Sequence, residues 1–104
     1  HHGTLNAVFL PAVIRFNAGH ESLQQRDTLA RMAQAMGLPP GADVAQAVHE
    51  LTGRLGLPTG LAQMGVQASQ FDAVIAHALK DHCHQTNPRL ASPEDYRAML
   101  EASM

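Results

Sequence analysis

The chain has 104 residues, of which 45% are hydrophobic and 15% charged, and its formal net charge is −2. This length builds one small domain or part of a larger one, and the near-neutral charge excludes an obvious electrostatic footprint for nucleic acid or anionic lipid. The charged fraction lies below the usual quarter, so we expect an ordered chain whose surface is more covered than that of a free-standing domain.

A single cysteine, Cys83, excludes an internal disulfide framework and fits a reducing compartment, so we expect a cytoplasmic protein. No apolar run reaches the ~18 residues that span a bilayer. Nothing at the start resembles a secretory signal peptide. We therefore expect neither a membrane nor nucleic acid among the partners.

The chain opens on His1, His2 and Gly3 and runs directly into an apolar segment. Two origins of the histidines stay open at this point, namely the remnant of a purification tag and the interior of a longer protein. Residues 8–16 are apolar on all sides. Pro11 argues against a central strand and would kink a helix. Because the rest of the chain has helical signals, we predict a buried, kinked helix here.

Four further helix starts are predicted by capping signals, each a small polar residue followed three positions later by an acid or amide. The first side chain accepts from an N–H group of the first turn, and the second reaches back to the cap. The pairs are Ser22 with Gln25, Asp43 with Gln46, Ser69 with Asp72, and Ser92 with Asp95. Pro93 strengthens the last start, because proline is favoured at the first helical position.

Apolar residues recur at helical spacing after these starts, within 29–36, 44–55, 71–82 and 96–100. Stops are predicted where glycine and proline cluster, at 37–41, at 56–58, at Gly65 after a short turn over 61–64, and at Asn87-Pro88. No segment alternates with period two. The sequence therefore predicts an all-α fold, an irregular bundle of five to six short helices.

Histidine is the residue type most suggestive of chemistry, with seven in the chain. Two metal ligands on one helix need a spacing of three or four, whereas His77, His82 and His84 are separated by five and two. We therefore expect solvated or capping histidines near a helix end. Cys83 is expected to be a small buried residue near a helix C-terminus, where the dipole opposes a thiolate. Without a phosphate loop or nucleophile motif, no catalytic residue is assigned.

Two stretches together carry a family resemblance. The first is the pattern H-G-x-x-N-A-x-x-L-P, which begins at His2, and the second is G-L-P at 56–58 followed by N-P-R at 87–89. In this order the motifs resemble the C-terminal portion of an iron-containing (group III) alcohol dehydrogenase. The resemblance is strong over 2–17 and 56–102 and loose between them. Ala12 departs from the pattern, because many members carry histidine after the Leu-Pro pair.

The resemblance implies that residues 1–104 are a C-terminal helical fragment, the metal domain, and that the NAD(P)-binding N-terminal domain is absent from this chain. In the family, one Asp and three His bind a divalent metal, and His2 matches the last of these ligands, which favours a native His2. The implied cofactors are Fe(II) or Zn(II), as a His and carboxylate site suits, and NAD or NADP. Cys83 falls where the family places a residue near the substrate pocket.

The function implied is that of a metal-dependent oxidoreductase interconverting a small alcohol or hydroxy acid and its carbonyl compound with NAD(P). The fragment alone is expected to be inactive. Its expected partners are the missing N-terminal domain, a small alcohol or aldehyde substrate, and further copies in a homo-oligomer. Two alternatives stay open, a maleylacetate-reductase-like enzyme of the same superfamily and a non-catalytic all-helical interaction module. The resemblance also leaves open which alcohol, which nicotinamide cofactor and which of the two metals are used.

Overall fold

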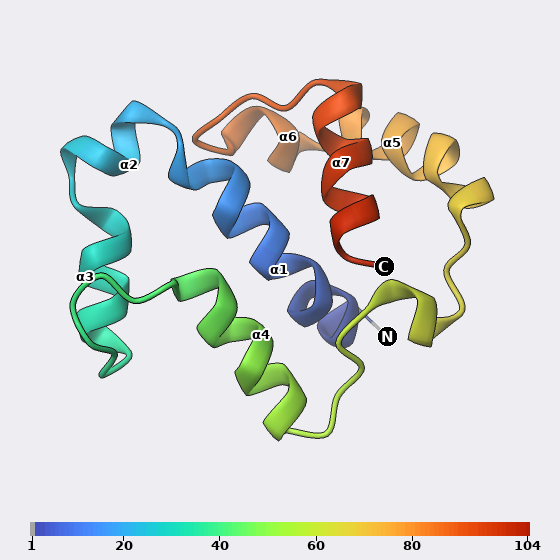
Figure 1. The fold of residues 1–104 in the computed structure, drawn as a ribbon. Coiled ribbons are helices and arrows are strands. Elements are labelled where there is room, and N and C mark those ends of the chain that lie inside the picture. The colour runs from blue at the N-terminus through green and yellow to red at the C-terminus, as the bar shows by residue number, and fades with distance from the viewer. Residues whose placement is uncertain (1) are drawn as a thin grey trace.

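The computed structural model describes residues 2–104, and His1 lies outside the described residues. These residues form an all-α fold without strands, which confirms the predicted fold class (Figure 1). The α-helices are α1 (His2–Ala18), α2 (Glu21–Gln25), α3 (Thr28–Ala35), α4 (Val44–Arg54), α5 (Phe71–Lys80), α6 (His82–Thr86) and α7 (Pro93–Ala102). Two 3₁₀ helices, η1 (Leu61–Met64) and η2 (Ala68–Gln70), lie between α4 and α5.

Helix α1 runs through the middle of the molecule and packs against α4 and α7 (Figure 1). The predicted helix over 8–16 is confirmed, and the structure extends it back to His2. Its buried residues are Val8, Pro11, Ala12 and Ile14, and they face different neighbours, since Val8, Ala12 and Ile14 each belong to a different core cluster. Pro11 is accepted inside the helix although it cannot donate a backbone hydrogen bond.

Two of the predicted helix starts are confirmed at the level of single atoms. Asp43 Oδ1 accepts from the backbone N–H of Gln46 at 2.9 Å and so caps α4. At α7, Ser92 Oγ accepts from the N–H of Asp95 at 3.0 Å, and Asp95 Oδ2 accepts from the N–H of Ser92 at 2.9 Å. This reciprocal pair is a complete capping box, which satisfies two donors that the helix itself leaves without partners.

The other two predicted starts are wrong, by two residues at α2 and by one at α5, whose cap is Gln70. Helix α2 is capped by His20, whose Nδ1 accepts from the N–H of Ser22 at 3.2 Å, so Ser22 lies inside the helix. Ahead of α5, Gln67 donates its N–H to Gln70 Oε1 at 2.7 Å and begins η2, which leads directly into the helix. Ser69 is therefore internal to η2. In both places the side chain that accepts the capping hydrogen bond is longer than serine, His20 at α2 and Gln70 at η2.

The structure divides two of the expected helices, which explains why it contains more and shorter helices than five or six. Between α2 and α3, Asp27 adopts a left-handed backbone with a φ of 48°. Between α5 and α6, Asp81 adopts an extended ψ of 140°. The apolar spacing over 71–82 continues across the second break, and no glycine or proline marks the first, so neither break was predicted.

The core consists of three clusters of buried residues that share α1. Val8 packs with Phe71, Ile75 and their neighbours, and Phe71 is only 2% exposed. Ile14 belongs to a second cluster with α3 and α4, and Ala12 to a third with α7. Because α1 contributes to every cluster, the apolar opening of the chain is the centre of the fold.

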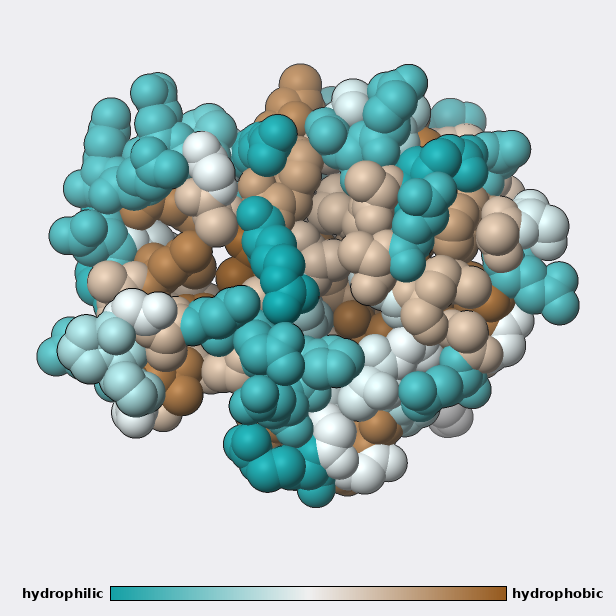
Figure 2. All heavy atoms as spheres, viewed as in Figure 1, coloured by the Kyte–Doolittle hydropathy of each residue, from teal (hydrophilic) through white to brown (hydrophobic). Residues whose placement is uncertain are grey.

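The molecule is flat and exposes more surface than a free globular protein of its size. Its principal extents are 39 × 32 × 19 Å and its radius of gyration is 14.2 Å, against about 13 Å expected for this length. The accessible surface is 6827 Å², whereas about 5,700 Å² is expected from a mass of 11.1 kDa. Figure 2 shows apolar side chains exposed at several places between polar ones. No helix within 2–104 is long and apolar enough to cross a membrane.

Candidate functional site

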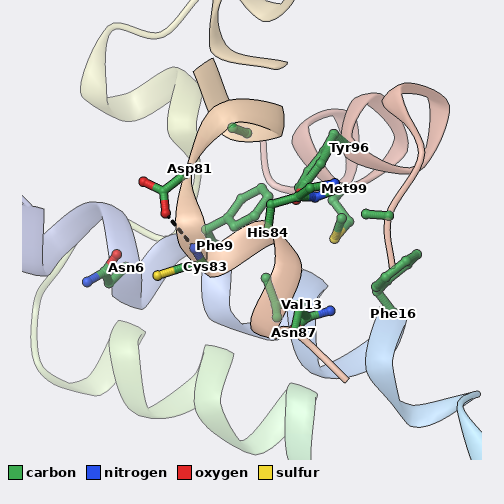
Figure 3. A pocket seen from close by; sticks show the side chains of 12 residues that line it. Asn6, Phe9, Val13, Phe16, Asp81, Cys83, His84, Asn87, Tyr96 and Met99 are labelled. Atoms are coloured by element: carbon green, nitrogen blue, oxygen red, sulfur yellow. Dashed lines mark hydrogen bonds between the residues drawn. The ribbon is translucent and has the colours of Figure 1, made fainter. Parts of the chain in front are cut away.

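A cavity of about 430 Å³ lies between α1, the junction of α5 and α6, and α7 (Figure 3). Its apolar wall is formed mainly by Phe9, Val13 and Phe16 of α1 and by Met99 of α7. Polar groups interrupt this wall on one side. They are Asn6, Asp81, Cys83, His84, Asn87 and Tyr96. A cavity of this size, mostly apolar with a few polar groups, has the general character of a small-molecule site.

Asp81 places Cys83 at this cavity. It ends α5 and caps α6, and its Oδ1 accepts from the backbone N–H of Cys83 at 2.8 Å. Cys83 is exposed and stands in the first turn of α6. The expectation of a buried residue near a helix C-terminus is therefore wrong, because the break at Asp81 starts a new helix there.

The electrostatic surroundings of Cys83 keep its thiol protonated. The hydrogen bond between the thiol and the Asp81 carboxylate raises the pKa of Cys83, and desolvation adds to the effect. Conversely, the hydrogen bonds that Asp81 receives from Cys83, from the backbone first, lower the pKa of that carboxyl. Because a thiolate is the nucleophilic form of cysteine, this arrangement suits contact with a ligand better than covalent catalysis.

His84 and Tyr96 form a hydrogen-bonded pair at the cavity that no sequence signal indicated. The His84 Nδ1 and the Tyr96 Oη are 2.6 Å apart, and the ring centroids are 5.6 Å apart. Burial raises the pKa of Tyr96, with a further contribution from the Asp81 charge, so its hydroxyl keeps its proton. The expectation of a solvated histidine does not hold for His84, which is half-buried.

His2 lies at a second cavity, of about 390 Å³, which adjoins the first. The two cavities share Asn6, Phe9, Ala78 and Tyr96 as lining residues. The His2 side chain is exposed, and the Asn6 Nδ2 lies 3.3 Å from its Nε2. Asn6 follows His2 by one helical turn, so the H-G-x-x-N spacing places both side chains on one face of α1.

The N-P-R motif acts as a clamp between the end of α6 and the end of α1. Asn87 Nδ2 donates to Asn17 Oδ1 at 2.7 Å, and Asn17 Nδ2 donates to Asn87 Oδ1 at 2.9 Å. Arg89 Nη1 donates to the Phe16 carbonyl at 3.0 Å, and its guanidinium lies 4.1 Å from the centre of the Phe16 ring. The end of α1 and the N-P-R motif, 70 positions apart at Asn17 and Asn87, thus meet at one edge of the cavity and fix its shape.

A group of three potential metal-ligand atoms lies beside the cavity, on Asp81, His82 and Cys83, all within 4.8 Å of one another. The spacings between histidines did not indicate this group, because its three members are consecutive residues of different types. Each member is exposed, and the Asp81 oxygen already accepts from a backbone N–H. Three atoms fall short of the four that a structural zinc site requires, so we assign no metal to this group.

The described residues thus form an all-helical domain with two adjoining cavities. Over residues 1–104 the chain matches the Fe-containing alcohol dehydrogenase family, C-terminal. The chain therefore belongs to the Fe-containing alcohol dehydrogenase family, and the resemblance drawn from its motifs is confirmed.

Several curated relatives are similar along nearly the whole chain. It is 64% identical over 104 residues to the 4-hydroxybutyrate dehydrogenase of Cupriavidus necator, covering 100% of this chain and 27% of the relative. It is 36% identical over 98 residues to the lactaldehyde reductase of Escherichia coli K12, which covers 90% of this chain and 26% of the relative. It is 28% identical over 111 residues to the NAD-dependent methanol dehydrogenase of Bacillus methanolicus, which covers 99% of this chain and 28% of the relative. The chain thus spans little more than a quarter of these relatives.

Proposed function

We propose that this chain is the C-terminal part of a metal-dependent oxidoreductase that interconverts a small hydroxy acid or alcohol and its carbonyl compound with NAD(P). The observation that carries the proposal is the 64% identity along the whole chain to a 4-hydroxybutyrate dehydrogenase. The cavity at Cys83 and the neighbouring cavity at His2 supply a place where a small substrate and a metal ligand would lie near each other.

His2 is the residue of this chain that would hold the metal. Its imidazole is exposed, lies at a cavity and has one ring nitrogen engaged by Asn6. This is the arrangement of a ligand whose orientation is fixed by a hydrogen bond at its other nitrogen. A single imidazole fits one position of a His and carboxylate site for Fe(II) or Zn(II), the remaining ligands coming from outside this chain. Such an ion polarises the alcohol or carbonyl oxygen of the substrate.

Cys83 and the apolar wall of α1 would form the substrate pocket. The protonated thiol and the Asn6 amide offer weak polar contacts, while Phe9, Val13 and Met99 exclude water from the carbon chain of the substrate. Exclusion of water protects hydride transfer to the nicotinamide from competing reactions. These side chains therefore bind and orient the substrate, and none of them transfers a proton.

The NAD(P)-binding part of the enzyme would be supplied by the segment that precedes this chain in the relatives. The surface here exceeds that of a compact protein of equal mass by about 1,100 Å², a typical area for contact between domains. Leu5 and Val74 line the cavity at His2 and are exposed, so an apolar surface adjoins the proposed metal ligand. We propose that the preceding domain covers this surface and completes the site.

The experiment is a metal and activity measurement on the intact enzyme that contains this chain. His2→Ala is compared with His77→Ala, an exposed histidine of α5 that lines neither cavity. Loss of a residue behind a ligand typically weakens metal binding 10- to 100-fold, so loss of a direct ligand should weaken it by at least about 100-fold. We expect H2A to lose bound metal and NAD(P)-linked oxidation of 4-hydroxybutyrate, and H77A to keep both. An H2A enzyme with full metal content would exclude the proposed ligand.

A further inference from the structure

The cavity at Cys83 contains a single side chain that can be cationic. Among its lining residues, which are all described in the structure, His84 alone is basic. The nearby Arg89 is committed elsewhere, because its guanidinium donates to the Phe16 carbonyl and stacks on the Phe16 ring. An anionic group entering this cavity would therefore find its counter-charge at His84.

Tyr96 fixes which ring nitrogen of His84 is available. The Nδ1 is occupied by the Tyr96 hydroxyl at 2.6 Å. When that hydroxyl donates to Nδ1, the proton of the neutral ring resides on Nε2, and in the protonated ring both nitrogens carry protons. With the Tyr96 hydroxyl donating to Nδ1, the Nε2 is a hydrogen-bond donor in both forms, and a carboxylate oxygen at Nε2 is the acceptor that favours this arrangement over the tautomer protonated at Nδ1.

The acidic group at the cavity opposes an anion there, since its charge also acts on Tyr96 and helps to raise the pKa of that hydroxyl. Asp81 carries the negative charge, but its Oδ1 accepts from the Cys83 N–H and its carboxylate lies 3.6 Å from the His82 Nδ1. In Figure 3 the Asp81 and Cys83 side chains lie toward Asn6, whereas the His84 side chain lies toward Tyr96. The cavity thus has Asp81, Cys83 and Asn6 on one side and the pair of His84 and Tyr96 on the other, and both Asn6 and Tyr96 also line the cavity at His2.

We propose that His84 binds the terminal carboxylate of a hydroxy acid substrate, with Tyr96 as its positioning residue. This inference rests on the proposed dehydrogenase function and adds the substrate class. The hydroxyl end of the substrate points to the side of Asn6 and His2. Its methylene groups contact the apolar wall formed by Phe9 and Val13. Such a site rejects the plain alcohol of equal length, because that alcohol would leave the His84 donor without a partner.

The test compares two substrates of four carbons, 4-hydroxybutyrate and 1-butanol, on the intact enzyme. His84→Gln removes the imidazole, and His82→Gln is the matched control, since His82 is a neighbouring exposed histidine that does not line the cavity. A hydrogen bond to a charged group corresponds to about 10- to 100-fold in affinity. We expect H84Q to lower kcat/KM for 4-hydroxybutyrate by that factor, mainly through KM, and to leave 1-butanol within about threefold. H82Q should leave both unchanged.

Two further measurements separate binding from folding. Tyr96→Phe keeps the ring but removes the hydroxyl, so we expect KM for 4-hydroxybutyrate to rise severalfold with kcat unchanged. Butyrate, which has the carboxylate and no hydroxyl, should compete with 1-butanol in the wild-type enzyme and compete at least tenfold more weakly in H84Q. Both readouts use 1-butanol turnover as the internal check that the variant is folded.

The outcomes that overturn the proposal are distinct from those that overturn the proposed function. Equal losses on both substrates in H84Q would make His84 a structural residue, and unchanged kinetics would remove it from the site. A wild-type enzyme that prefers 1-butanol to 4-hydroxybutyrate would refute the carboxylate site while the dehydrogenase function stands. A metal-loaded enzyme that oxidises neither substrate with NAD or NADP would refute both.

Discussion

Glycine is required at position 60 because there is no room for a Cβ atom, not because of its backbone conformation. Its φ of −147° is open to any residue, but a Cβ at this position would overlap the carbonyl oxygen of Met104 and lie 2.9 Å from its carbonyl carbon. The backbone of the last two residues lies over Gly60 because Leu61 donates its N–H to the Ser103 carbonyl at 2.7 Å, and Ala62 donates to the Met104 carbonyl at 3.2 Å. The overlap involves backbone atoms, which cannot move aside as a flexible side chain can.

Gly60→Ala should therefore displace residues 103–104 from η1 and break both hydrogen bonds. Each is worth about 0.5–1.5 kcal/mol, so the free energy of unfolding should fall by about 1–3 kcal/mol. Gly53→Ala is the control of opposite sign. A Cβ at Gly53, inside α4, meets only Thr59 Cγ2 at 3.7 Å, and replacing a helical glycine by alanine should raise stability by about 0.5–1 kcal/mol.

The assay is urea unfolding of the 104-residue chain followed by far-ultraviolet circular dichroism. Deleting Ser103 and Met104 removes the obstacle, so the G60A substitution should be nearly neutral in the shortened chain. Stability unchanged within about 0.5 kcal/mol in the full chain would refute the close packing of its end on Gly60. An equal loss in the full and shortened chains would assign the effect of G60A to another cause.

Two further predictions concern the edge and the mouth of the cavity. In a double-mutant cycle measured by urea unfolding, Asn17→Ala and Asn87→Ala should each lower the free energy of unfolding. Because the two side chains share two hydrogen bonds, their coupling energy should be about 1–2 kcal/mol, and strictly additive losses would contradict the clamp. Asp81→Asn keeps a good helix cap but removes the charge that holds the Cys83 thiol protonated, so the thiol pKa should fall. Iodoacetamide should then alkylate Cys83 at neutral pH faster in the Asp81→Asn variant than in the wild type. The control is Asp72→Asn, which removes another exposed carboxylate and should leave the rate unchanged. An equal rate in all three proteins would exclude the role of Asp81.

Local signals in the sequence predicted most of the helices, because the start and end of a helix depend mainly on residues close in the chain. The capping residues Asp43 and Ser92 act over three positions, and their hydrogen bonds form as expected. The breaks at Asp27 and Asp81 were not predicted, since no glycine or proline marks either of them and the apolar stripe over 71–82 runs past Asp81. His20 as a helix cap was missed because histidine is uncommon in that role.

The candidate site was predictable only where a motif carried it. His2 and Cys83 came from the family pattern, and the structure places them at adjoining cavities. The pair of His84 with Tyr96 depends on how α6 and α7 pack, which no spacing within either helix encodes. A site residue that is positioned by a hydrogen bond from another helix can therefore be found only once the packing of the helices is known.

The position of Asp81 shows how one break in a helix creates the site. Had α5 continued to Asn87, each residue would follow the last by 100°, and Cys83 and His84 would keep the direction set by the α5 stripe. The extended backbone at Asp81 instead starts α6 on a new axis, and its carboxylate holds the first turn through the Cys83 N–H. The clamp from Asn87 to Asn17 then fixes the other end of the five-residue helix against α1. With both ends held, so short a helix can present Cys83 and His84 to one cavity in a fixed geometry.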